Sequence, residues 1–413
     1  MVPAALAAAI AKQAETSPQN TQSEGIVPGR LLLADGDGLC YYCAGNDETA
    51  PGQARINLLD KLRSAARSCG AERIKVLVTG AGSHKGYRYA VARVKPYQGH
   101  RTGNHRPKNW QFLRELLEQG DLPPDIEIEF THTAEADDLF SRYAEMHPDC
   151  VIFTQDKDMR MVPGKHLEWK THILTDVPPC WVLTAHDLVY GRQWFWMQML
   201  HGDAADNIPG LPWYTDGSIN KSGLNKGKVK EIRCGEASSA VKGLDKVSSD
   251  MGACIYLQGL YRTCYGERWL VNMLEQGILL WMRTDMESNP FDVTKPGHPL
   301  HPLTSHADWP AARQEILIRI AEGQINEKTE DHGSGTDQDS DAAGAGEPLQ
   351  SVQSAVCTEP SGAGPRSPDG CGAGSAAPGM QRPAGQGGEQ PQAVRGAVPG
   401  SVPQWMRRLS AKA

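Results

Sequence analysis

The stretch Arg30-Leu-Leu-Leu-Ala-Asp35 is a short apolar run that ends in an acid followed by glycine. Its length and its lack of polar alternation predict a strand buried on both faces of a sheet. Further strands are predicted over residues 73–79, 126–130 and 150–154, the second of them at a sheet edge. Apolar residues at helical spacing predict intervening helices over residues 53–69, 108–119 and 134–147. This alternation predicts an α/β fold with a mostly parallel central sheet flanked by helices.

Composition divides the 413 residues into four predicted parts. Residues 1–27 are alanine-rich and predicted to be a disordered leader, and residues 28–184 form the α/β domain. Helical signals over 185–190, 193–201 and 251–283, around a Gly/Lys-rich loop at 217–230, predict a helical subdomain over 185–325. Residues 326–413 are acidic and then Gly/Pro/Ala-rich, so we expect a disordered tail that buries too little apolar surface to offset its ordering entropy.

Several classes of protein are excluded by charge and hydropathy. No run approaches the roughly 18 uncharged apolar residues that span a bilayer, and no basic residues precede the apolar N-terminal segment as in an export signal. We therefore expect a cytoplasmic protein with no membrane partner. A net charge of −7 argues against coating nucleic acid by bulk charge, so a polyanion would need a local basic patch. Cys40 and Cys43 have no second pair at zinc-binding spacing.

Acids cluster at the ends of the predicted elements. They are Asp35, Glu135, Asp137, Asp138, Asp156, Asp158, Asp203 and Asp206. The carboxyl ends of parallel strands line one crevice, and acids three residues apart share a helix face, so we expect these eight carboxylates to converge. Taken singly, Glu135, Asp137 or Asp206 is explained as well by a helix or turn cap.

Converging carboxylates repel one another and raise each other's pKa unless cations compensate them. An oxygen-only set suits Mg²⁺ or Mn²⁺ better than Zn²⁺, and the number of acids indicates two ions. Two ions about 4 Å apart can activate a water and stabilise the leaving oxygen in a phosphodiester displacement.

A basic stretch runs from Arg73 to Arg114. It has ten Lys or Arg residues and no acid: Arg73, Lys75, Lys85, Arg88, Arg93, Lys95, Arg101, Arg106, Lys108 and Arg114. This pattern indicates binding to a phosphate backbone, with Tyr97 and other interleaved rings for base stacking; the alternative is a solvated surface loop. A weaker second signal is Asn207-Ile-Pro-Gly210 followed by Lys221, Lys226 and Lys228, where backbone amides freed by glycine turns can hold phosphate oxygens.

Five motifs, in this order and spacing, resemble the 5′→3′ exonuclease and flap endonuclease superfamily, and within it the exonucleases of short-tailed bacteriophages. They are LLLADGDGL, PYQGHR, EADDLF, TQDKDM and GDAADNIPGLP, spread over Leu31 to Pro212. The resemblance implies a PIN/FEN-like fold, a basic arch at about residues 81–107 that admits the 5′ strand, and a monomer. It also implies a helix-three-turn-helix subdomain that grips duplex DNA and binds K⁺.

The resemblance assigns roles to the acids and to one arginine. Asp35, Glu135, Asp137 and Asp138 would hold one Mg²⁺ or Mn²⁺ ion, and Asp156, Asp158, Asp203 and Asp206 the other. Arg101 would steady the scissile phosphate, with Asp35, Asp137 and Asp156 as the catalytic carboxylates. DNA contacts are predicted for Lys85, Arg88, Lys95, Tyr97, Arg101, Gly210, Lys221, Lys226 and Lys228.

The implied activity is a two-metal 5′→3′ exodeoxyribonuclease of DNA replication, with flap endonuclease or RNase H-like cleavage as related activities. Its substrates would be duplex DNA with a 5′ end, a flap or an RNA–DNA hybrid. The chain departs from the family at Gly80, where an aspartate is usual, and at Gln98, where a lysine is usual. We expect the first ion to be held more loosely, and Lys85, Arg88 or Lys95 to supply the missing charge.

Two alternatives stay open. One is a relative that binds DNA structures without cleaving them, because Gly80 and Gln98 replace two functional residues. The other is an aspartate-nucleophile phosphatase, since an apolar strand followed by Asp35-Gly-Asp37 also opens such enzymes. The phosphatase would leave the basic stretch and the motif at residues 202–212 unexplained.

Overall fold

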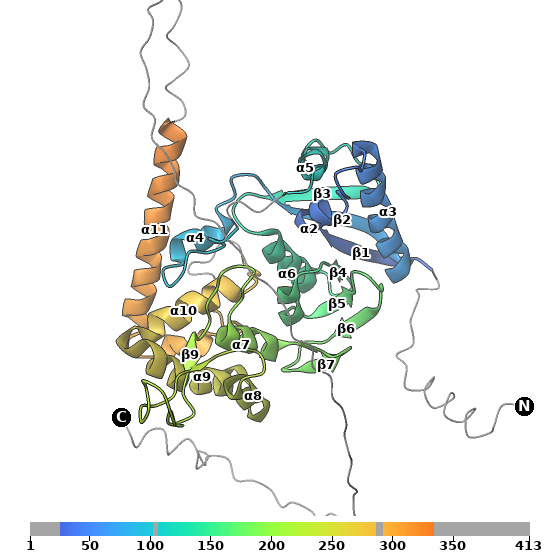
Figure 1. Cartoon of the computed structure of the whole chain (residues 1–413). Coiled ribbons are helices and arrows are strands. Elements are labelled where there is room, and N and C mark those ends of the chain that lie inside the picture. Colours follow the sequence, from blue (N-terminus) through green and yellow to red (C-terminus); the bar gives the residue numbers. More distant parts are fainter. Residues whose placement is uncertain (1–24, 102–105, 286–291, 334–413) are drawn as a thin grey trace, which may run out of the picture. The chain divides into compact units, whose positions relative to one another are not determined.

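The computed structural model describes residues 25–101, 106–285 and 292–333 (Figure 1). It contains a six-stranded sheet. The strand order is β3-β2-β1-β4-β5-β6. Their bounds are β1 Val27–Asp35, β2 Ala71–Thr79, β3 Ile126–Thr131, β4 Val151–Phe153, β5 Gly164–Leu167 and β6 Leu174–Val177. All neighbouring pairs are parallel except β5 and β6. The predicted mostly parallel α/β sheet, with residues 126–130 at an edge, is therefore confirmed.

Helices cover both faces of this sheet. Those of the N-terminal half are α2 Gly36–Tyr42, α3 Pro51–Cys69, α4 Arg88–Val91, α5 Trp110–Glu118 and α6 Ala136–Met146. Along β1, Leu32 and Ala34 belong to one hydrophobic cluster, with α2, α3 and α5. Leu31 and Leu33 belong to a second cluster, with α6. Because successive strand residues face opposite sides, the unbroken apolar run in β1 supplies both cores.

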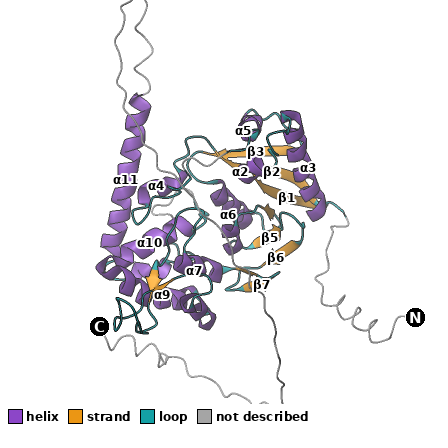
Figure 2. Ribbon diagram, in the orientation of Figure 1, coloured by secondary structure: helices purple, strands orange, loops and turns teal. Residues whose placement is uncertain are grey.

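Beyond β6 the chain is mainly helical, as predicted (Figure 2). The helices are α7 Arg192–His201, α8 Ser239–Lys242, α9 Asp250–Tyr265, α10 Trp269–Leu280 and α11 Trp309–Gly333. Short 3₁₀ segments are η1 Lys85–Tyr87, η2 Lys157–Met161, η3 Gly243–Lys246, η4 Gly266–Arg268 and η5 His301–Ser305. The cluster that contains Leu31 and Leu33 continues through α7, α9 and α10 into α11, so the sheet and the helical part share one core.

Two predicted helices are corrected by the structure. Residues 185–190 belong to an antiparallel hairpin of β7 Leu183–Ala185 and β8 Leu188–Tyr190. His186 (φ 51°) and Asp187 (φ 61°) form its two-residue turn, and both lie in the left-handed region that tight hairpins require. The predicted helix over 251–283 is divided at Gly266 (φ 57°), which ends α9 before α10 begins.

The predicted ends of the chain are only partly described. Residues 326–333, predicted as disordered, continue helix α11. Residues 1–24 of the predicted leader and 334–413 of the predicted tail lie outside the described residues. Two short strands that were not predicted flank the Gly/Lys-rich loop and pair with each other, β9 Trp213–Tyr214 and β10 Ile232–Arg233. No helix in the described part of the chain is long and apolar enough to cross a membrane.

Candidate metal and nucleic-acid site

The carboxyl ends of β1 and β4 are tied together by Asp35. Its Oδ2 accepts a hydrogen bond from Thr154 Oγ1 (2.9 Å), just after β4, and its Oδ1 accepts from the amide of Gly38 (2.8 Å). Only glycine fits at position 38, because a Cβ there would lie 2.6 Å from Asp35 Oδ2. Thr154 Oγ1 in turn accepts from the amide of Asp156 (2.9 Å), so one hydroxyl sets the positions of both acids.

The start of α6 is held against the end of β2. The amide of Ala136 donates to Thr79 Oγ1 (3.0 Å), and Thr79 is the last residue of β2. This contact carries Glu135 and Asp137 to the same edge of the sheet as Asp35 and Asp156. Three segments therefore bring acids to this edge of the sheet. The loop after α7, which carries Asp203 and Asp206, is the fourth segment.

Asp35, Asp137 and Asp156 form the centre of the carboxylate group. Burial, followed by repulsion from Asp156 and Asp35, raises the pKa of Asp137 well above its usual range. Burial also raises the pKa of Asp35 to about 6 and that of Asp156 to about 7, with neighbouring acids adding to both shifts. Among the described residues, no lysine, arginine or histidine forms an ion pair with any of the three. These are the carboxylates that most need an added cation.

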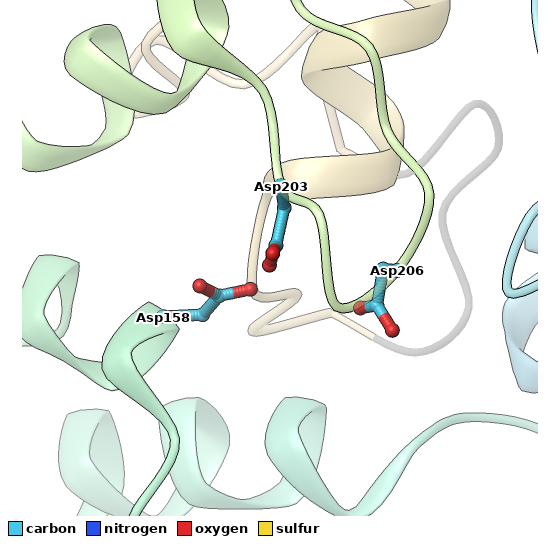
Figure 3. A group of neighbouring side chains, drawn as sticks. All are labelled: Asp158, Asp203 and Asp206. Carbon is cyan, nitrogen blue, oxygen red and sulfur yellow. The ribbon is translucent and has the colours of Figure 1, made fainter. Parts of the chain in front are cut away.

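Asp158, Asp203 and Asp206 form a second carboxylate group (Figure 3). One carboxylate oxygen from each of Asp158, Asp203 and Asp206 lies within 4.8 Å of the others. Lys157 Nζ is 2.7 Å from Asp203 Oδ1 and 3.8 Å from Asp158 Oδ1. Burial and the charge of Asp156 raise the pKa of Asp158. Burial also acts to raise the pKa of Asp203, but the contact with Lys157 outweighs burial, so the pKa of Asp203 is lowered. This group, unlike the centre, already has a protein cation.

Asp206 connects the carboxylates to the basic stretch. Its Oδ1 accepts from Gln98 Nε2 (2.8 Å) and pairs with the Arg101 guanidinium. The Tyr97 hydroxyl lies 2.8 Å from Glu135 Oε2 and 3.1 Å from Asp206 Oδ2. Burial and these two acids raise the pKa of Tyr97 well above its usual value, so it stays a proton donor. The Tyr97 side chain is buried against the carboxylates, and the predicted DNA contact stays a prediction.

Asp138 and Arg88 form a buried ion pair instead of the metal and DNA contacts predicted for them. Both side chains are 0% exposed, and the two guanidinium nitrogens of Arg88 lie 2.8 and 2.7 Å from the two Asp138 oxygens. Asp138 also accepts from the amides of Arg283 (2.9 Å) and Glu135 (3.2 Å). Burial acts to raise the pKa of Asp138, but Arg88 outweighs it and lowers it. With its oxygens occupied, Asp138 joins α6 to the helical part.

Lys85 lies at the Glu135 end of the carboxylates. Its Nζ is 2.6 Å from Gln98 Oε1 and 3.3 Å from Glu135 Oε1. Lys85 (φ 49°), Gly86 (φ 64°) and Tyr87 (φ 62°) are three consecutive residues in the left-handed region, which is costly for the two residues that are not glycine. Such local strain is common at functional sites. Of the three residues expected to supply the charge missing at Gln98, Lys85 and Arg88 reach Glu135, whereas Lys95 is exposed.

The remaining predicted DNA contacts divide by exposure. Lys95, Arg101, Lys221, Lys226 and Lys228 are exposed, so these predictions stay open. Gly210 is buried: its amide donates to Gln276 Oε1 (3.0 Å) and its carbonyl accepts from the Tyr265 hydroxyl (2.8 Å). The prediction that the Gly210 amide holds a phosphate is therefore wrong.

Most cations of the basic stretch are neutralised by acids that come from elsewhere in the chain. The pairs are Arg73–Glu127, Lys75–Glu127 and Glu129, Lys85–Glu135, Arg88–Asp138, Arg93–Glu322, Arg101–Asp206 and Arg114–Asp37. The segment is also anchored from the helical part, because Glu275 accepts from the amides of Arg93 (2.9 Å) and Val94 (2.8 Å). Only part of this stretch is thus available to a polyanion, and residues 102–105 of the predicted arch lie outside the described residues.

Two further features were not predicted. Asp37 accepts from the amide of Thr79 (3.1 Å) and pairs with Arg114, which joins the start of α2 to the end of β2. Lys157 lies between Asp156 and Asp158 in the TQDKDM motif. This position in the sequence could have indicated a lysine inside the site. Gly80 stands where the resembling family usually has an aspartate. A Cβ at this position would lie 2.3 Å from the His132 ring, so a side chain here would require that ring to move.

The donor set fits divalent cations. The charge interactions of Asp137 and Asp156 include Asp35, Glu135, Asp158, Asp203 and Asp206, and within this set Asp158, Asp203 and Asp206 bring one carboxylate oxygen each within 4.8 Å of one another. Hard oxygen donors of this kind suit Mg²⁺ or Mn²⁺. The Lys157 ammonium acts as a stand-in cation at Asp203, which shows that this position favours positive charge.

No protein-family model and no curated protein matches the sequence. The structure is similar to three solved structures from bacteriophage T5. They are a protein co-crystallised with metal ions (12% identity, TM-score 0.40), a flap endonuclease variant in a pseudo-enzyme–product complex with DNA and metal ions (13%, 0.40), and a 5′-exonuclease with bound zinc (14%, 0.42). The matches cover 70–71% of this chain and 99% of each matched chain. At these identities and TM-scores, the function proposed for this chain rests on the contacts of the site and not on these matches.

Proposed function

We propose that this chain is a metal-dependent nuclease that hydrolyses phosphodiester bonds at DNA 5′ ends in the 5′→3′ direction and uses two Mg²⁺ or Mn²⁺ ions. The observation that carries the proposal is the mutual repulsion of the buried carboxyls of Asp35, Asp137 and Asp156, none of which forms an ion pair with a cation among the described residues. Burying three such acids is unfavourable unless cations bind there. Flap or RNA–DNA hybrid cleavage belongs to the same proposal as an alternative substrate choice.

In this mechanism Asp35, Asp137 and Asp156 would hold the first ion, and Asp158, Asp203 and Asp206 would hold the second. Bound ions would supply a water activated for attack and neutralise charge on the leaving oxygen. The chain itself supplies the frame. Thr154 sets the relative positions of Asp35 and Asp156, and Tyr97 bridges Glu135 and Asp206.

Cations of the basic stretch would hold the phosphate. Lys85 Nζ and the Arg101 guanidinium both lie at the carboxylate edge, on Glu135 and Asp206 respectively. A phosphate that approaches the ions would take over these cations, because charge-assisted hydrogen bonds to phosphate are strong. Exposed Lys221, Lys226 and Lys228 would contact the backbone of the duplex without reading its sequence. The helix-three-turn-helix and its K⁺ stay predictions.

Digestion of 5′-labelled duplex and flap DNA tests the proposal. Wild-type protein should release short 5′-labelled products with Mn²⁺ or Mg²⁺ and none in EDTA, and Asp156→Asn should release none under either condition. Asp60→Asn is the matched control, because Asp60 is exposed on α3 and makes no ion pair among the described residues. Equal product release by wild type and Asp156→Asn would refute the site. Metal-independent DNA binding without cleavage would favour the relative that only binds DNA.

The phosphatase alternative has less support. Its second aspartate, Asp37, has one oxygen on the amide of Thr79 and the other on Arg114, so both oxygens are already engaged within the chain. Trapping of a phospho-aspartate at Asp35 would reverse this judgement.

A further inference from the structure

Lys157 contacts the carboxylates that the proposed nuclease would use for its second ion. Its Nζ lies 2.7 Å from Asp203 Oδ1, which also accepts from the amide of Ala205 (2.8 Å), and 3.8 Å from Asp158 Oδ1. Asp203 is buried and Asp158 is buried, so neither carboxylate is well compensated by solvent. The ammonium therefore balances a group that would otherwise repel itself.

A divalent ion and this ammonium cannot share the oxygen. Mg²⁺ takes oxygen ligands at about 2.0–2.1 Å, and the lone pairs of Asp203 Oδ1 already face Lys157 and the amide of Ala205. An ion at that oxygen would place two like charges in direct contact. Binding of an ion at Oδ1 thus requires the ammonium to leave.

The first ion meets no such competitor. Asp35, Asp137 and Asp156 form no ion pair with a lysine or arginine anywhere in residues 25–101, 106–285 and 292–324. The two proposed ion sites therefore differ in one property that affects ion binding: the second already contains a protein cation.

We propose that Lys157 is a built-in counter-ion of the second metal site, which the second ion must displace, so that the two ions bind in order. This inference rests on the proposed two-ion function. Lys157 can leave because its side chain is 34% exposed and carries a flexible four-carbon stem, in contrast to Arg88, which is 0% exposed. The displaced ammonium is then free to pair with the phosphate of a bound strand.

Isothermal titration with Mn²⁺, supported by electron paramagnetic resonance of free Mn²⁺, tests the proposal without any nuclease reaction. Lys157→Met keeps the stem and removes the charge, so the dissociation constant of the second ion should fall by about tenfold while that of the first stays unchanged. Lys157→Arg keeps the charge and should leave second-ion binding as weak as in wild type. Lys165→Met is the matched control, since Lys165 pairs with Asp176 (2.9 Å) outside the site.

The outcomes separate this inference from the proposed function. If wild type binds divalent ions and Lys157→Met binds the second no more tightly than wild type and Lys165→Met do, Lys157 is not a counter-ion, and the nuclease proposal stands. If wild type binds no divalent ion at all, the metal-dependent function itself is refuted and this inference with it. Circular dichroism checks that each variant is folded, and Lys157→Gln repeats the test should Lys157→Met fail to fold.

Discussion

Replacing Asp35 with asparagine should stabilise the metal-free protein, and the gain should grow with pH. Burial, and then the charge of Asp37, raises the pKa of Asp35 from 3.8 to about 6. A carboxyl with a raised pKa in the folded state favours folding below its unfolded pKa of 3.8, and this contribution is lost as the pH rises through about 6. The shift of roughly two units corresponds to about 3 kcal/mol at neutral pH and above, of which about 2 kcal/mol develops between pH 4.5 and pH 7.5.

The substitution removes this charge while it keeps the local contacts. Asparagine Oδ1 can still accept from the Gly38 amide, and Nδ2 can donate to Thr154 Oγ1. Urea unfolding in EDTA, followed by circular dichroism at pH 4.5 and pH 7.5, measures the free energy of unfolding of both proteins. The advantage of Asp35→Asn over wild type should widen by about 2 kcal/mol between the two pH values. Asp60→Asn, at an exposed position on α3, should show no such widening.

Divalent ions should narrow this difference in stability. At a Mn²⁺ concentration about a hundredfold above its dissociation constant, wild type should gain about 2.7 kcal/mol, and Asp35→Asn should gain less because a ligand is lost. An advantage of Asp35→Asn that stays constant or narrows with rising pH would show that Asp35 is not a buried, repelled carboxylate, and would remove the main physical reason for placing an ion beside it.

Three further predictions concern residues whose roles the structure assigns. Arg88→Met should lower the free energy of unfolding by about 3–5 kcal/mol, because Asp138 stays buried without its partner, and Arg88→Met with Asp138→Leu should recover most of it; a stable single variant that only binds DNA less tightly would restore the predicted DNA contact. Gly210→Ala should destabilise by about 1–3 kcal/mol, since Gly210 has φ 60° and a Cβ would lie 2.4 Å from the Gly202 nitrogen; unchanged urea unfolding would contradict the close packing. Lys85→Met should lower kcat for 5′-end hydrolysis by roughly a hundredfold while Mn²⁺ affinity changes little, with exposed Lys95→Met as the control; a change confined to KM would mean that Lys85 only binds substrate.

The strands of the sheet and their terminal acids were accessible from local patterns. Unbroken apolar runs are typical of strands buried on both faces, and the parallel arrangement places their carboxyl ends at one edge. The position of Asp35 at the end of β1 and of Asp156 after β4 follows from these two rules. The hairpin at residues 183–190 was missed because the two left-handed residues of its turn, His186 and Asp187, carry no glycine signal.

The basic stretch shows where local reasoning ends. Within residues 73–114 no acid offsets the ten cations, yet acids from β3, α6 and more distant segments pair with seven of them. Arg88 and Lys95 look alike in sequence, but one is fully buried on Asp138 and the other is exposed. Which cation can reach a phosphate is therefore a property of the folded chain.

By itself, the amino-acid sequence determined the α/β class, the strand ends and the set of acids that share one edge, because these depend on residue spacing along each element. Only the tertiary structure decided the charge balance of the site: Asp138 is neutralised by Arg88, Asp203 is held by Lys157, and Asp35 pairs with no cation in the part of the chain that the structure describes. Coulomb interactions depend on distance through space and on burial, and neither quantity can be read from separation along the chain.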